Sequence, residues 1–255
     1  MEFNRLRAAL ILTAFCLIIP APVISAPDTT LTQSAQLPTQ LTGTDIAASP
    51  ADKARAMLHI KNLMGTIDAV SASVYQTKHL AMLKKAIETQ GTVLLARPHR
   101  LRWEITNPDR SITLIDETTI TIYKPLEKEA DIYAIDSNIA AKQSMAFFSS
   151  TMWGDLSEME KRFKADIYIK KGYIIYKLVP TSEMAARYLT SIVIYFNEAT
   201  GTPAGFELVT PKGDRYVTSL KDVKKNPTFG TDMFNLKLPK EVWIRDHTKP
   251  DEHGR

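Results

Sequence analysis

The sequence predicts a mainly β fold with some α-helix: one curved, largely antiparallel sheet whose concave face is covered by helices. Short segments in which apolar and polar residues alternate recur along most of the chain, with turn signals between them, as in an antiparallel meander. Two segments with helical periodicity, residues 49–65 and 138–159, interrupt the series, and no β-α-β rhythm appears. We expect such a sheet to form an incomplete, half-open β-barrel, with the helices as a lid over a hydrophobic interior.

The composition is that of a chain that builds one large core without disulfides. It has 255 residues, of which 44% are hydrophobic and 24% are charged. The single cysteine, Cys16, excludes an internal disulfide framework and any multi-cysteine metal site. The formal net charge of +4 is too balanced for a dedicated nucleic-acid-binding protein.

The first 26 residues have the pattern of a secretory signal peptide. Arg5 and Arg7 precede the apolar run of residues 8–20, and small residues and prolines follow it. The run is shorter than the roughly 20 residues that span a bilayer, so a transmembrane anchor is the weaker interpretation. We expect cleavage after Ser25 or Ala26, with Ser25 favoured, and therefore an exported chain.

The rest of the chain divides into a leader, one domain and a tail. Residues 27–48 are rich in Thr, Gln, Ser and Pro, which predicts a flexible polar leader. Ser49 as N-cap, with Asp52 three residues later and a proline between them, predicts the start of the first helix. The domain is expected to span residues 49–245, and residues 246–255 form a polar tail.

About a dozen strands are predicted within the domain. They are expected at residues 70–75, 89–96, 100–106, 111–115, 119–123, 130–135, 163–169, 173–179, 189–196, 205–209, 215–223 and 233–236. Their apolar side chains, with those of residues 138–159, exceed what one sheet face hides, so a ligand cavity is a hypothesis beside ordinary core packing. The candidate cavity residues are Val93, Leu95, Leu101, Trp103, Ile105, Ile112, Leu114, Ile120, Ile122, Met145, Phe147, Phe148, Ile194 and Phe196.

The signatures of an enzyme are missing from the sequence. Its five histidines are scattered without metal-ligand spacing, and it has no nucleophile elbow, Walker loop or dinucleotide-binding motif. Residues 96–104 interleave basic and aromatic residues. In a strand, however, their charges lie on one face, opposite Leu101, Trp103 and Ile105. We therefore expect no catalytic residues, no metal, no cofactor and no nucleic-acid partner.

Several short motifs occur in a fixed order along residues 50–245. They are residues 91–98 (GTVLLARP), 101–104 (LRWE), 107–109 (NPD), 123–125 (YKP), 178–180 (LVP) and 234–239 (FNLKLP). Together they resemble the periplasmic outer-membrane lipoprotein carriers of Gram-negative bacteria, the LolA family. The resemblance implies an incomplete antiparallel barrel whose helices close a hydrophobic cavity for the acyl chains of lipoproteins.

The resemblance also implies residue roles and partners. Arg97 falls on the arginine that bonds to the lid and holds it closed when the cavity is empty, and Leu101 and Trp103 fall at the cavity mouth. The implied protein is a monomeric periplasmic chaperone. Its partners would be acylated lipoproteins, an inner-membrane ABC transporter complex and an outer-membrane receptor lipoprotein.

Two alternatives stay open beside lipoprotein transport. Residues 116–120 lack the glycine and the aromatic residue that the family has at this turn. One alternative is therefore a carrier of another lipid-like molecule in an envelope lipid or pigment export system. The other is a periplasmic domain that senses acyl chains without transporting them.

Overall fold

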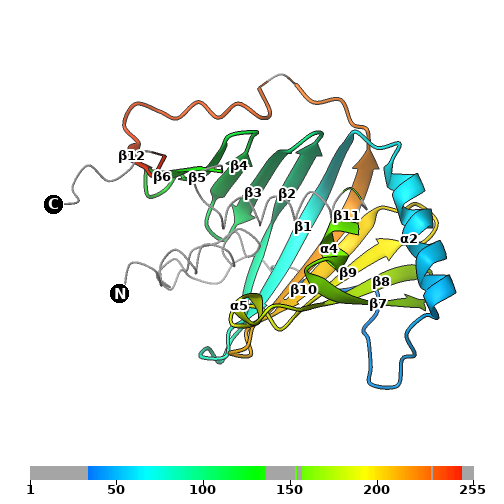
Figure 1. Cartoon of the computed structure of the whole chain (residues 1–255). Coiled ribbons are helices and arrows are strands. Elements are labelled where there is room, and N and C mark those ends of the chain that lie inside the picture. Colours follow the sequence, from blue (N-terminus) through cyan, green and yellow to red (C-terminus); the bar gives the residue numbers. More distant parts are fainter. Residues whose placement is uncertain (1–33, 136–152, 154–156, 231, 249–255) are drawn as a thin grey trace.

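Twelve strands form one open, curved sheet in the computed structural model (Figure 1). The structure describes residues 34–135, 153, 157–230 and 232–248. In chain order the strands are β1 (Ala69–His79), β2 (Ile87–Ala96), β3 (Arg100–Asn107), β4 (Ser111–Ile115), β5 (Thr119–Lys124), β6 (Glu129–Ala134), β7 (Phe163–Lys170), β8 (Tyr173–Pro180), β9 (Ser191–Asn197), β10 (Pro203–Val209), β11 (Arg215–Lys225) and β12 (Trp243–Asp246). The described helices are α2 (Pro50–Met64), α4 (Ser157–Glu160) and α5 (Glu183–Ala186).

The strand order across the sheet is β12-β6-β5-β4-β3-β2-β1-β11-β10-β9-β8-β7. Neighbouring strands are antiparallel, except that β12 runs parallel to β6. The pairing of β1 with β11 joins two hairpin series that are far apart in the sequence. Because β7 and β12 are edges that do not pair with each other, the sheet stays open. The predicted curved antiparallel sheet is confirmed.

Helix α2 begins where the sequence predicts it. The Asp52 N–H donates to Ser49 Oγ over 3.2 Å, and the Ser49 hydroxyl donates to the Asp52 carboxylate over 2.6 Å. The buried residues of the helix, Ala56, Ile60 and Met64, belong to the same hydrophobic core as the inward-facing residues of the sheet. Burial of this apolar stripe fixes the helix on the sheet.

The strand predictions hold from residues 70–75 to residues 215–223, with bounds that differ by a few residues. The prediction of a strand at residues 233–236 is wrong. The N–H of Met233 donates to Gly230 O over 3.1 Å, so this segment begins with a turn. Strand β12 follows it and was not predicted, and neither was the short helix α5.

Charge fixes the edge strand β12 to β6. Arg245 donates to both carboxylate oxygens of Asp131, over 2.7 and 2.9 Å, and to Glu129 over 2.9 Å. His247 bonds to Asp131 over 3.1 Å and stacks on the ring of Tyr133. These contacts join groups that are more than a hundred residues apart in the chain.

The described part of the predicted leader, residues 34–48, lies on the convex face of the sheet. Leu37 and Leu41 pack against a separate apolar cluster formed by Ile175, Val193 and Tyr195. The backbone is tied to the sheet at the end of the segment, where the Ala48 N–H donates to Ile167 O over 2.7 Å. Two leucines within a polar composition are enough to hold this segment on the sheet.

Candidate functional site

The concave face of the sheet carries the larger of the two buried apolar clusters in the described structure. Cross-strand partners share a face, so the register shows which side chains point inward. Trp103 lies between Val93 on β2 and Thr113 on β4, for example. The buried side chains of this face and of α2 form one continuous core.

Most of the candidate cavity residues are brought together on this face. Those that are buried in the common core are Val93, Leu95, Leu101, Trp103, Ile105, Ile120, Ile194 and Phe196, and Ile122 packs against it partly buried. Met145, Phe147 and Phe148 lie outside the described residues. The structure therefore places these residues in one apolar set on the concave face, from β5 to β9 in the order of the sheet.

Ile112 and Leu114 are not part of that set. Ile112 pairs with Glu104 and Leu114 with Arg102, which puts both side chains on the convex face. Ile115 faces inward instead, because it pairs with Leu101. Apolar residues of β4 lie on both faces of the sheet, so its sequence does not show which face is inward. The pairing with β3 decides which side chains point inward.

Three inward-facing side chains of β8 are further members of the concave face: Ile174, Tyr176 and Leu178. The alternation of β8 predicts a strand but does not say which sheet neighbour it meets. Its partners Phe196, Ile194 and Ile192 on β9 are also buried in the common core. A prediction that paired β8 with β9 could have included these residues.

Arg97 joins the sheet to the end of α2. Its Nε donates to Ile67 O over 2.9 Å, and its Nη2 donates to Met64 O over 3.4 Å. The guanidinium also lies 4.6 Å from the centre of the Trp153 ring. Carbonyl groups at the end of a helix carry partial negative charge, so a cation is favourable there. Arg97 therefore holds the segment that ends α2 against the sheet.

Three further contacts hold α2 beside the half of the sheet formed by β7 to β11. Lys53 Nζ donates to Ala165 O over 2.8 Å and forms an ion pair with Glu160 over 2.6 Å. In the middle of the helix, His59 Nε2 lies 2.7 Å from Glu198 O. Lys53 and His59 lie outside the apolar stripe of α2. Their contacts therefore fasten the helix without being part of the core.

Two donor groups within the apolar set of the concave face have no hydrogen-bond partner among the described residues. They are Trp103 Nε1 and the Tyr176 hydroxyl oxygen, and both are buried. Burial, reinforced by the charge of Glu160, raises the pKa of the Tyr176 hydroxyl, so that it keeps its proton at neutral pH. Both groups can donate a hydrogen bond to an oxygen of a bound molecule.

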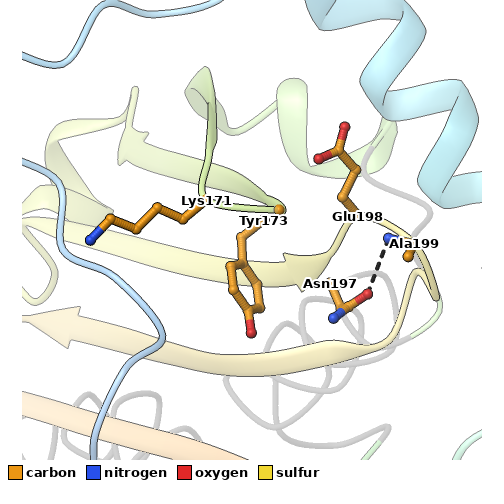
Figure 2. A pocket seen from close by; sticks show the side chains of 6 residues that line it. Lys171, Tyr173, Asn197, Glu198 and Ala199 are labelled. Atoms are coloured by element: carbon orange, nitrogen blue, oxygen red, sulfur yellow. Dashed lines mark hydrogen bonds between the residues drawn. The ribbon is translucent and has the colours of Figure 1, made fainter.

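A pocket of different character lies where the β7–β8 and β9–β10 turns meet (Figure 2). It is lined by Lys171, Gly172, Tyr173, Asn197, Glu198 and Ala199. The Asn197 side-chain oxygen accepts a hydrogen bond from the Ala199 N–H over 3.1 Å. Tyr173 packs on the convex cluster, so this polar pocket does not belong to the concave face.

Metal chemistry has no arranged site in the part of the chain that the structure describes. No group of three His, Cys, Asp or Glu side chains there could hold a metal ion. Within the same residues, no helix has the length and apolar character needed to cross a membrane.

Comparison with known proteins gives the family. The sequence model described as outer membrane lipoprotein carrier protein LolA matches residues 65–237. The chain belongs to the LolA family. This confirms the resemblance predicted from the sequence motifs, and the matched LolA description names a carrier and not an enzyme.

Individual LolA relatives are distant. The outer-membrane lipoprotein carrier protein of Vibrio campbellii is 25% identical over 201 residues, which are 78% of this chain and 87% of the relative. That of Sodalis glossinidius is 26% identical over 161 residues, which are 62% of this chain and 72% of the relative. A solved structure of an uncharacterized conserved protein from Thermus thermophilus has a TM-score of 0.48 at 13% identity and covers 76% of this chain and 99% of its own.

Proposed function

We propose that the protein is a periplasmic carrier that holds the acyl chains of lipoproteins against its concave face on the way from the inner to the outer membrane. The observation that carries the proposal is the continuous apolar cluster on the concave face, which runs from β5 to β8 in the order of the sheet, in a chain of the LolA family. Each methylene group removed from water contributes about 0.8 kcal/mol, so acyl chains bind such a surface strongly. The names of the relatives describe the same cargo.

The concave face opens when α2 moves, and Arg97 acts as the gate. With α2 in place, its residues Ile60 and Met64 occupy the apolar surface that acyl chains would cover. The Arg97 contacts to Ile67 O and Met64 O favour this closed state. The apparent affinity for cargo is then lowered by the small fraction of molecules that are open. Removing the Arg97 contacts raises that fraction.

A displacement assay tests both parts of the proposal. A fluorescent hydrophobic dye should bind the purified protein, and a synthetic lipopeptide with acyl chains should displace it, whereas the same peptide without acyl chains should not. Arg97→Leu should bind the dye more tightly. The matched control is Arg100→Leu, because Arg100 is exposed, lies over the ring of Phe234 and touches only the backbone oxygen of Arg97, over a long 3.5 Å, instead of reaching α2.

Two results would contradict the proposal. If the unacylated peptide displaces the dye as well as the lipopeptide does, the concave face does not recognise acyl chains. If Arg100→Leu changes dye binding as much as Arg97→Leu does, Arg97 is not a gate. Mass spectrometry of lipids that co-purify with the native protein separates lipoprotein cargo from another lipid-like cargo of an envelope export system.

The carrier proposal includes the partners that the family resemblance implies. An inner-membrane ABC transporter complex would supply the acylated lipoprotein, and an outer-membrane receptor lipoprotein would accept it. Trp103 Nε1 and the Tyr176 hydroxyl would then meet ester or amide oxygens of the cargo, because both are buried donors without a partner. The implied site residues remain those of the concave face with Arg97 at its edge.

A further inference from the structure

The turn between β1 and β2 presents apolar side chains to solvent. Met82 is 87% exposed and Leu83 is 43% exposed. The turn is ordered by a hydrogen bond from the Leu83 N–H to Leu80 O over 2.9 Å. Two large apolar side chains at the tip of an ordered hairpin are kept in water, where they lose the free energy of burial.

Two other connections lie beside this turn. The Ala81 N–H donates to the Asp214 carboxylate over 2.8 Å, which ties the turn to the β10–β11 connection. Helix α5 lies at the same end of the sheet (Figure 1), and the Thr190 N–H that follows it donates to Val209 O at the end of β10 over 2.8 Å. There Met184 is 70% exposed. One end of the sheet thus carries three exposed apolar side chains from two separate segments.

The same three connections also carry basic side chains. The four in these connections are Lys84, Lys85, Arg187 and Lys212, all exposed, and none forms an ion pair with another described residue. The acidic residues of the same connections are Glu183 and Asp214, and Asp214 already accepts the hydrogen bond from Ala81. We call Met82, Leu83 and Met184 with these four basic residues the tip surface.

We propose that the tip surface docks the protein onto the surface of an anionic lipid bilayer. Apolar side chains flanked by lysines suit the boundary between headgroups and acyl chains. The apolar side chains enter the acyl region, and the lysines attract the anionic headgroups. The tip surface combines both features on ordered turns. This inference does not rest on the identity of the cargo, because its residues lie outside the concave core.

Co-sedimentation with vesicles tests the tip surface. The purified protein should sediment with phosphatidylcholine vesicles that contain phosphatidylglycerol, less so at high salt, and not with phosphatidylcholine alone. Lys84→Gln with Lys85→Gln should weaken binding about thirtyfold. Met82→Ser with Met184→Ser should weaken it about tenfold, because the apolar contribution is lost.

Matched controls are available at other exposed positions. Ile46 is 90% exposed and Leu58 is 58% exposed, and changing both to Ser should leave vesicle binding unchanged. Lys171 and Lys224 are exposed at the opposite end of the sheet, so changing both to Gln removes the same charge from another place. Equal loss in these controls, equal binding to neutral vesicles, or no sedimentation of the unmodified protein at low salt would overturn the proposal.

Discussion

Two arginines each hold a peripheral element on the sheet, but they use different acceptors. Arg97 donates to backbone carbonyls at the end of α2, which are neutral groups, and its only carboxylate neighbour among the described residues is the exposed Asp68, in a long ion pair of 3.8 Å. Arg245 in β12 donates to the carboxylates of Asp131 and Glu129. Both arginines make charge-assisted hydrogen bonds, but Arg245 also gains the attraction between opposite charges and the geometry of a bidentate pair with a carboxylate.

The two arginines therefore contribute differently to holding their elements. The Arg97 contacts are few and one of them is long, so they add only a modest free energy to the burial of Ile60 and Met64 that holds α2 on the sheet. The Arg245 contacts are bidentate, and Asp131 is almost fully buried, so β12 stays on β6. Under the proposed function, α2 uncovers a ligand surface whereas β12 closes a sheet edge, and these opposite properties suit the two tasks.

The largest expected effect is on the Asp131 side of the comparison. Asp131→Asn removes the negative charge that Arg245 and His247 meet, and it should lower the free energy of unfolding by about 2 kcal/mol. Urea unfolding followed by circular dichroism measures the change. Asp109→Asn is the control, because Asp109 lies exposed in the β3–β4 turn and should change the free energy little. Equal values for the two variants would contradict a strong β12 anchor.

Acid should weaken the β12 anchor and spare the Arg97 contacts. Burial alone would raise the pKa of Asp131, but the hydrogen bonds and charges of Arg245 and His247 outweigh it and hold the pKa below the usual 3.8. The stabilisation is therefore present above that pH and is lost as the pH falls through the lowered pKa.

The free energy of unfolding, measured by urea unfolding at a series of pH values from neutral to acid, tests this difference. Between neutral pH and acid, Asp131→Asn should lose less free energy of unfolding than the unmodified protein. Arg97→Leu should lose nearly as much as the unmodified protein, because the carbonyl groups that Arg97 meets do not titrate and its 3.8 Å ion pair with the exposed Asp68 is screened by solvent. A flatter acid limb in Arg97→Leu would show that a carboxylate takes part in holding α2.

The Arg97 side should give a smaller change in stability. Arg97→Leu loses one hydrogen bond of ordinary length, one long one and the contact with the Trp153 ring, and it should lower the free energy of unfolding by about 1 kcal/mol. Urea unfolding measures it beside Arg100→Leu. A loss as large as that of Asp131→Asn would mean that α2 is not the more weakly held element.

The sequence predicted those parts of the structure whose signals are local. The cap at Ser49, the strand alternation and the position of Arg97 in its motif are each contained in a few neighbouring residues. Strand β12 could not be predicted, because four residues without a strong pattern depend on Asp131 far away in the chain. The inward position of Ile115 likewise depends on pairing with Leu101 and not on its own strand.

The smallest change, Arg97→Lys, separates charge from shape at the end of α2. Lysine keeps the positive charge near the helix carbonyls, but its single ammonium group replaces the fork with which arginine reaches both Ile67 O and Met64 O. We expect a loss of about 0.5 kcal/mol in the free energy of unfolding and a dye affinity between those of the unmodified protein and Arg97→Leu. Urea unfolding and dye titration measure the two values. If Arg97→Lys matches Arg97→Leu in both, charge contributes nothing and the fork alone holds α2, whereas a match to the unmodified protein would show that charge is sufficient.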